Sequence, residues 1–165
     1  MIKVKQSNAV SAYNVLKQIK TKELPAEVAI AIWKNVKVLK PIATSYEEAI
    51  KDSKESLKGT NDDEMSKLLA ELQKKETDEA AGKYTFTRTD IENRTKVTEY
   101  YSNAQNKLNA FIKELDNREV EIEHTTISED DLIKALIGTD FNIGVIELID
   151  FLFEDATKVD DKEDK

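Results

Sequence analysis

The sequence contains no cysteine, which excludes disulfide bonds, thiolate metal ligands and a cysteine nucleophile. It has only four glycines and two prolines in 165 residues, so breaks in regular secondary structure are few. No apolar run approaches the roughly 20 residues that a membrane-spanning helix needs. The first ten residues, MIKVKQSNAV, lack the apolar centre of a secretion signal. We therefore expect the protein to remain in the cytoplasm in which it is made.

Motifs that carry known chemistry are missing as well. The sequence has no glycine-rich phosphate loop, no EF-hand spacing and no nucleophile elbow. Two acidic clusters, residues 62–64 and 129–131, have oxygen ligands that suit a hard cation. Each cluster stands where a helix is predicted to begin, and acidic side chains stabilise the positive end of a helix dipole without any metal. We therefore predict no catalytic, cofactor-binding or metal-binding residue, and no enzyme activity.

Charge is abundant but unevenly distributed along the chain. The formal net charge is −8, yet residues 1–58 hold 11 lysines against 6 acidic side chains, whereas residues 59–165 hold 14 basic and 27 acidic ones. A chain with such asymmetry can meet a partner by charge complementarity. Lys34, Lys37 and Lys40 share one face of a predicted helix and could follow phosphates. Because arginine is absent from the first 87 residues and the whole chain is acidic, we favour a solvated helix face over nucleic-acid binding.

Two long helices are predicted from matched heptad seams, in which apolar and small residues alternate at spacings of four and three. The first seam contains Ile32, Val36, Leu39, Ala43, Tyr46, Ile50, Ser53 and Leu57, and the second contains Val97, Tyr101, Ala104, Leu108, Phe111 and Leu115. We therefore predict an antiparallel helical hairpin with a coiled-coil-like seam over about residues 26–117, with a shorter helix in the connection. Pro41 predicts a kink, or two helices in near-continuation.

A small two-stranded sheet is predicted between residues 2–6 and 119–126, since both segments alternate apolar and polar side chains. Pairing them places apolar residues side by side and lysines against glutamates. The second segment also contains the only histidine, His124, three residues after Glu121, a spacing that serves metals on helices. On a strand these two side chains point to opposite faces. We therefore interpret His124 as a boundary residue at the end of a half-buried strand.

Two helices are predicted to close the chain, the first over residues 128–137 and the second capped by Thr139 or Asn142. The second is apolar nearly all round, which predicts burial on several sides or an interface with another protein. Its candidate interaction surface consists of Val145, Ile146, Leu148, Ile149, Phe151, Leu152 and Phe153. Residues 156–165 predict a disordered acidic tail, so residues 1–155 are predicted to form a single elongated domain of the mainly α (α+β) class.

The order of these elements resembles a family of small uncharacterised proteins encoded by tailed phages and prophages of Gram-positive and gut bacteria. The resemblance spans most of residues 1–155 and is carried by Ile2–Gln6, by Leu24-Pro25 before a long helix, by Glu119–Ile122 and by the apolar closing helix. The family is a domain of unknown function without assigned catalytic residues. The resemblance therefore implies a phage setting, in the cytoplasm of a bacterial host or in the virion, and a non-enzymatic role.

From these observations we expect a non-catalytic phage-type protein that binds another protein, of phage or host, through its helical faces. This role includes that of a virion or assembly component. The bound protein can also be a second copy of the chain, which gives a homo-oligomer. The alternative is a host-directed inhibitor, whose acidic surface over residues 59–165 mimics nucleic acid or blocks a basic site on a host defence protein. An enzyme with a carboxylate-bound metal is the least favoured alternative. We expect no membrane contact.

Overall fold

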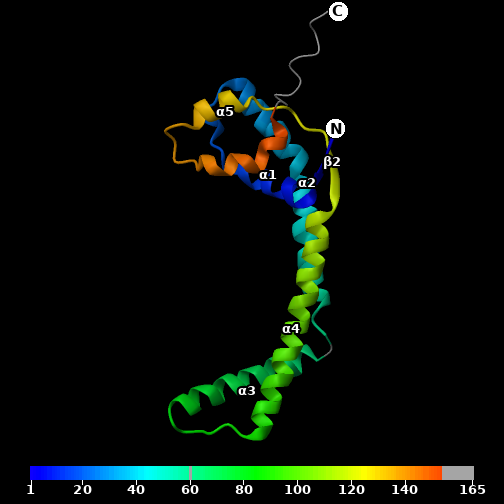
Figure 1. The fold of residues 1–165 in the computed structure, drawn as a ribbon, viewed down its shortest axis with the longest axis vertical. Helices are drawn as coiled ribbons and strands as arrows, with labels where there is room; N and C mark the ends of the chain where they lie inside the picture. Colours follow the sequence, from blue (N-terminus) through cyan, green and yellow to red (C-terminus); the bar gives the residue numbers. More distant parts are fainter. Residues whose placement is uncertain (60, 154–165) are drawn as a thin grey trace, which may run out of the picture. The chain divides into compact units, whose positions relative to one another are not determined.

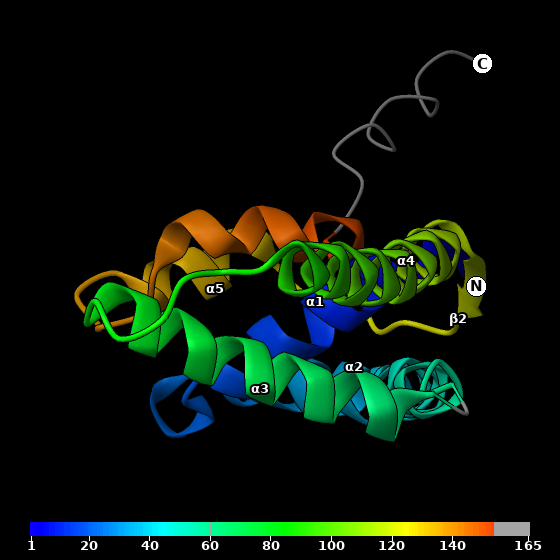
Figure 2. The same ribbon diagram turned by 90° about the horizontal axis from the view of Figure 1, so that it is seen from below.

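The computed structural model describes residues 1–59 and 61–153, so the predicted acidic tail lies outside the described residues. The fold is mainly α with one small antiparallel sheet, as the sequence predicts. The path of the chain can be followed in Figures 1 and 2. The elements are β1 (Ile2–Lys5), α1 (Gln6–Gln18), the 3-10 helix η1 (Thr21–Glu23), α2 (Ala26–Ser56), α3 (Asp62–Ala80), α4 (Arg88–Asn117), β2 (Glu119–Ile122), α5 (Glu129–Leu136) and the 3-10 helix η2 (Ile143–Leu152).

The chain divides into two compact units. Among the described residues, the first unit contains Met1–Glu47 together with residues 115–153, and the second unit contains Glu48–Glu114. Both long helices, α2 and α4, therefore contribute residues to each unit. That residues 1–155 act as a single domain stays a prediction.

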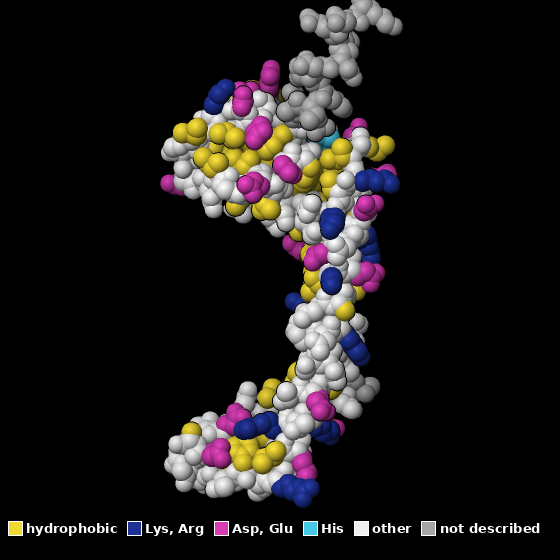
Figure 3. Space-filling view, in the orientation of Figure 1, with side chains coloured by type: hydrophobic (Ala, Val, Ile, Leu, Met, Phe, Trp, Pro, Cys, Tyr) yellow, Lys and Arg dark blue, Asp and Glu magenta, His cyan; other side chains and the backbone are white. Residues whose placement is uncertain are grey.

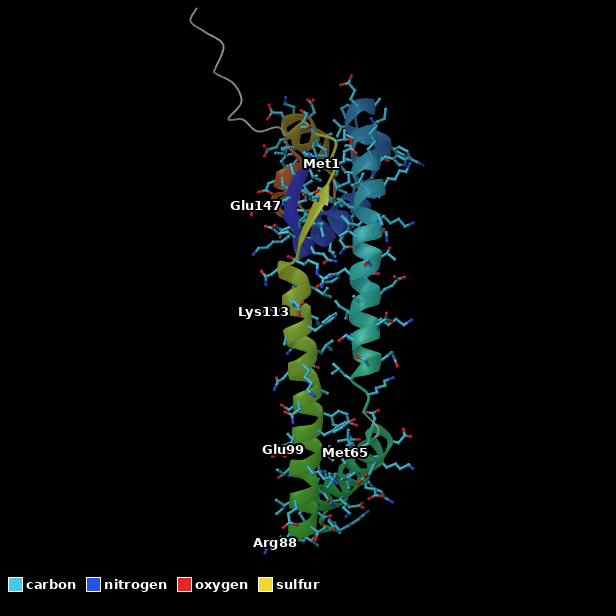
Figure 4. The ribbon with its side chains drawn as sticks, turned by 90° about the vertical axis from the view of Figure 1, so that its right-hand side faces the viewer. Met1, Met65, Arg88, Glu99, Lys113 and Glu147 are labelled. Carbon is cyan, nitrogen blue, oxygen red and sulfur yellow. The ribbon has the colours of Figure 1, made fainter. Side chains whose placement is uncertain are left out.

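The strands β1 and β2 pair in an antiparallel sense and lie side by side in the first unit (Figure 4). Their register places apolar residues opposite each other and lysines opposite glutamates, which confirms the predicted pairing: Ile2 with Ile122, Val4 with Val120, Lys3 with Glu121, and Lys5 with Glu119. Lys3 Nζ lies 3.6 Å from a carboxylate oxygen of Glu121 at the surface. This exposed pair helps to fix the register and contributes little to stability.

The second strand is shorter than predicted, because it ends at Ile122 rather than near residue 126. Ile122 pairs with Ile2, where β1 begins, so the residues that follow Ile122 have no partner in β1. Asn35 of α2, which is 1% exposed, binds this next part of the chain instead. Its amide nitrogen donates to the Thr125 carbonyl at 2.6 Å, and its amide oxygen accepts from the Thr125 N–H at 2.9 Å. A side-chain amide thus satisfies the backbone groups that a neighbouring strand would otherwise pair, and His124 lies beyond the strand.

The core of the first unit is built around α1, which contacts both strands and η2. The buried side chains of α1 follow a helical spacing of three and four, so one face of the helix is directed inward. The same core takes in the apolar face of α2, Ile122 at the end of β2, and one row of η2. In the second unit, Met65, Leu72 and Val97 join α3 to α4.

The two long helices and α3 give the hairpin-like, helix-rich arrangement that the seams predict, and every seam position is buried or half-buried. The alternative of two helices at Pro41 is wrong, since α2 is one continuous helix that contains this residue, and the kink stays a prediction. Pro41 and Lys37 are both exposed, so the hydrogen bond that proline cannot make is lost on the solvent side of the helix. Tyr46 Oη donates to the Asp116 carboxylate at 2.6 Å.

Candidate functional site

The closing helix η2 winds with three residues per turn, so residues three apart lie in the same row along its axis. One row begins at the exposed Ile143 and continues with Ile146, Ile149 and Leu152, which are 5%, 0% and 0% exposed and belong to the core of the first unit. These three members of the predicted interaction surface therefore pack inside the chain and are not accessible to a partner. An α-helical winding would not have placed them on one line.

A second row of η2 contains Val145, Leu148 and Phe151, and we call it the apolar ridge. Leu148 is 47% exposed, and the other two side chains are half-buried. The last predicted surface residue, Phe153, is half-buried and forms a parallel bridge with Ile127 just after the helix. Of the seven residues predicted to form the interaction surface, those of the apolar ridge and part of Phe153 are therefore accessible at the surface.

The third row of η2 contains Glu147 and Asp150, both exposed, and we call it the acidic ridge. The space-filling view shows apolar side chains gathered over η2 with acidic side chains around them (Figure 3), and Glu147 lies at the outer side of the helix (Figure 4). Two further exposed side chains extend the apolar surface nearby: Ile143, 41% exposed at the start of η2, and Ile137, 64% exposed after α5. An apolar centre with a charged rim is typical of a protein-binding surface.

The local sequence explains the position of this helix. Asn142 caps η2, because its side-chain oxygen accepts a hydrogen bond from the Gly144 N–H at 3.0 Å. Gly138, at a φ of 87°, allows the sharp turn between α5 and η2 that a side chain would strain. A hollow of about 600 Å³ lies beside this turn, lined among others by Leu24, Phe141 and Val145. One end of the apolar ridge therefore borders a concave surface.

His124 is half-buried, and its Nδ1 has no hydrogen-bond partner within residues 1–59 and 61–153. Burial lowers the pKa of His124, and the positive charge of the N-terminus lowers it further. Glu121 is engaged with Lys3 on the strand. In the part of the chain that the structure describes, no group of three or more His, Asp or Glu side chains could hold a metal ion.

The two acidic clusters lie in the first turns of α3 and α5, where the sequence predicts helix starts. In α5, the Ser128 hydroxyl accepts a hydrogen bond from the Asp131 N–H at 3.4 Å, as an N-cap does. In α3, Asp62 accepts from Tyr100 Oη at 3.2 Å, and Glu64 pairs with Lys96 at 3.4 Å. These carboxylates therefore lie where they stabilise the positive end of a helix dipole, and two of those in α3 also contact α4.

Sequence reasoning missed Asp90, which is 2% exposed near the start of α4. Its carboxylate accepts hydrogen bonds from Lys75 Nζ, from Tyr84 Oη at 2.6 Å, and from the Thr87 N–H and hydroxyl at 2.9 and 2.6 Å. The Lys75 ammonium first, and then Thr87 and Tyr84, hold the pKa of Asp90 well below its usual range. The spacing Thr87-x-x-Asp90, with reciprocal bonds between the two residues, is a capping-box signal that could have found it.

Sequence reasoning also missed Trp33 as a surface residue. It is 61% exposed on the outer face of α2, the face that also contains Lys34, Lys37 and Lys40. The signal is its helical phase: Trp33 stands directly between Ile32 and Lys34, outside the heptad seam. Tryptophan is enriched among the residues that contribute most to binding in protein interfaces.

The structure therefore defines a mainly α protein with a small sheet and an apolar ridge flanked by acidic side chains. No family model, no curated protein and no solved structure matches the chain. None of the helices within the described residues combines the length and the apolar character that crossing a membrane requires.

Proposed function

We propose that this is a non-catalytic protein that acts by binding another protein through the apolar ridge of η2. The observation that carries the proposal is the different burial of two apolar rows in one short helix. One row of η2 fills the chain's own core, and the neighbouring apolar row remains partly exposed with Leu148 at its centre. The buried row anchors the helix, so the exposed row is held in place before a partner arrives. Such preorganisation lowers the entropic cost of binding.

We further propose that the setting is that of a phage, with the protein acting as a virion or assembly component in a bacterial host. This part rests on the resemblance of Ile2–Gln6, Leu24-Pro25 and Glu119–Ile122 to the phage and prophage family. Its test is mass spectrometry of purified virions and of assembly intermediates from an infected or induced culture. Recovery of the protein in either fraction supports the role, and its absence from both contradicts it.

The distribution of charge in the second unit supports the alternative of an acidic inhibitor less well than the apolar ridge supports binding through η2. A mimic of nucleic acid needs unneutralised carboxylates along one face. Several acidic side chains of α3 and α4 instead pair with cations: Glu76 with Arg94 at 2.7 Å, Glu64 with Lys96 at 3.4 Å, and Glu92 with Arg88 at 3.0 Å. In the view of Figure 3, acidic and basic side chains are interspersed over these helices. We therefore favour binding through η2.

Photo-crosslinking in cells that make the protein tests the proposed contact directly. A benzophenone amino acid replaces Leu148 in one variant and Ile91 in a matched control, since Ile91 is a comparably exposed apolar side chain, at 56%, in α4. We expect the Leu148 variant to crosslink to a protein chain and the Ile91 variant to give no such product. If neither position crosslinks, or both give the same products, the apolar ridge is not a specific binding surface.

A substitution complements the crosslink. Replacing Leu148 with glutamate places a charge in the centre of the ridge and should weaken partner capture. The thermal melt should change much less, because a charge at a side chain that is 47% exposed can reach water. Ile91→Glu is the control and should leave capture intact. Loss of capture in both variants would show that general surface charge, rather than the ridge, decides binding.

A further inference from the structure

A second exposed apolar surface lies in the same unit as η2, on the outer face of α2. Ile30 is 53% exposed and Trp33, the only tryptophan of the chain, is 61% exposed. They stand three residues apart and so lie on neighbouring turns of one helix face. The opposite face of α2, with Ile32, Asn35 and Leu39, is buried in the core. The outer face is thus held rigidly by the packing behind it.

This outer face is also basic. Lys34, Lys37 and Lys40 are exposed on the same side of the helix, and none of them forms an ion pair with the residues that the structure describes. Lys37 Nζ lies 5.5 Å from the centre of the Trp33 ring, a cation–π contact that holds the ring and the charge together. We call Ile30, Trp33 and the three lysines the aromatic–lysine face.

The region around η2 has the complementary character. Its apolar ridge is flanked by Glu147 and Asp150, and residues 128–153 contain six acidic side chains against one lysine. One surface of the first unit is therefore apolar and acidic, and another is apolar, aromatic and basic. Both surfaces combine a hydrophobic centre with charge at its edge, which is the composition of protein interfaces.

We propose that the partner bound by the apolar ridge is a second copy of this chain, and that η2 of one copy docks on the aromatic–lysine face of the next. The proposal rests on the function proposed above. Trp33 and Ile30 cover Leu148 and its neighbours, while the lysines meet Glu147 and Asp150. Burial of the apolar residues provides affinity, and the charges set the orientation. Because two different patches meet, the contact is heterologous, and repetition leads to a closed ring or an open filament.

A charge-swap experiment tests this pairing. The first variant carries Glu147→Lys with Asp150→Lys, and the second carries Lys34→Glu with Lys37→Glu. Wild-type protein should associate with rising concentration in sedimentation velocity. Each variant alone should bind itself at least about 10-fold more weakly, because like charges then meet across the contact. An equimolar mixture of the two variants should associate again, since each variant offers the surface that the other lacks.

The fluorescence of Trp33 reports association between copies at the aromatic–lysine face. As the only tryptophan, it should emit at shorter wavelength when association covers it, and at longer wavelength on dilution. Lys51→Glu with Lys54→Glu is the matched control, since these exposed lysines lie further along α2 and outside the aromatic–lysine face. This control should associate like wild type, and circular dichroism should show that all variants are folded.

Each outcome decides between the proposals. A wild-type protein that stays monomeric at every concentration, or a mixture of variants that fails to associate, overturns pairing between copies. If the benzophenone at Leu148 then still crosslinks to a foreign protein or to a basic peptide, the proposed function stands with a different partner. If neither association nor any crosslink at Leu148 is found, both the proposed function and this inference fail. Association that shifts Trp33 emission only when nucleic acid is added would assign the aromatic–lysine face to that ligand instead.

Discussion

Ile122 and His124 are separated by one residue, yet their surroundings differ strongly. Ile122 is 2% exposed and packs in the core at the end of the sheet, opposite Ile2. His124 is half-buried in the irregular segment that follows, and its Nδ1 has no partner among the described residues. A polar substitution at Ile122 should therefore lower the stability of the fold, whereas the contribution of His124 to stability depends mainly on its protonation state.

Replacing Ile122 with aspartate should destabilise the protein by on the order of 2–4 kcal/mol, because it buries a charge that has no partner. Urea denaturation followed by circular dichroism measures this loss. Glu121→Gln on the exposed side of the same strand is the control and should change the free energy of unfolding by less than about 0.5 kcal/mol. Equal effects of both substitutions would show that the two faces of the strand are not buried differently.

Replacing His124 with glutamine should cost under about 1 kcal/mol at neutral pH, since no cavity, cap or salt bridge is lost. Burial lowers the pKa of His124 below the ordinary value of 6.5, so the folded state binds the proton less readily than the unfolded state. Stability is therefore full above that value and decreases as the pH falls through the lowered pKa. Denaturation at pH 7.5 and 5.5 should show a smaller pH-dependent loss in His124→Gln than in wild type.

No other histidine titrates in this range, so a pH dependence that is unchanged in the variant would contradict the lowered pKa. Loss of a measurable activity or of metal binding in His124→Gln, with an unchanged melt, would contradict the interpretation of His124 as a structural boundary residue.

At the scale of elements, the start of α4 depends on one buried carboxylate. Asp90 joins Lys75 of α3, Tyr84 of the connecting segment and Thr87 at the helix start. The segment between α3 and α4 has no regular structure, and Gly82, at a φ of 69°, provides its turn. Asp90 therefore ties an irregular connection to two helices at once, in addition to its role in the capping box.

Asp90→Asn should lower the melting temperature and expose the amides at the start of α4 to faster hydrogen exchange, because it removes a buried charge from its ammonium partner. Glu92→Gln, which breaks only an exposed pair with Arg88, is the control and should have little effect. Since the folded pKa of Asp90 lies below its unfolded value, its contribution is present above about pH 4 and is lost as the pH falls further. Asp90→Asn should therefore differ less from wild type in strong acid than at neutral pH.

At the scale of the whole molecule, the two units have very different cores. The hydrophobic cluster of the first unit contains 16 buried residues, whereas Met65, Leu72 and Val97 are the buried members of the second. The second unit is also crossed by exposed ion pairs, which contribute little stability. Local opening free energies follow the density of buried apolar contacts, so the two units should differ in stability.

Native-state hydrogen exchange should show lower protection in α3 than in α1. Met65→Ala should reduce protection in α3 and the facing part of α4, and it should leave α1 and the sheet unchanged. Leu16→Ala should act in the opposite way, since Leu16 belongs to the core of the first unit. If both substitutions reduce protection equally throughout the chain, the protein unfolds as one cooperative unit.

The sequence by itself determined the features that depend on local periodicity. The heptad seams predicted the long helices, the period-two alternation of residues 2–6 and 119–126 predicted the pairing of two strands, and Ser128 marked the start of α5. These signals are readable because a buried face repeats at the period of its own helix or strand. The seven apolar residues of the closing helix were likewise recognised as a group.

Only the tertiary structure decided which of those apolar residues remain accessible, and where β2 ends. A row of η2 is buried because α1 packs on it. The strand β2 ends at Ile122 because this residue pairs with the first residue of β1, and Asn35 binds the Thr125 backbone from 90 positions away. The capping-box spacing of Asp90 and the helical phase of Trp33 are local signals. The contacts of Asp90 with Lys75 and Tyr84 and the exposure of Trp33 were decided only by tertiary packing. Local spacing specifies the faces of an element, but the packing of residues distant in the chain decides which face meets the core and which meets a partner.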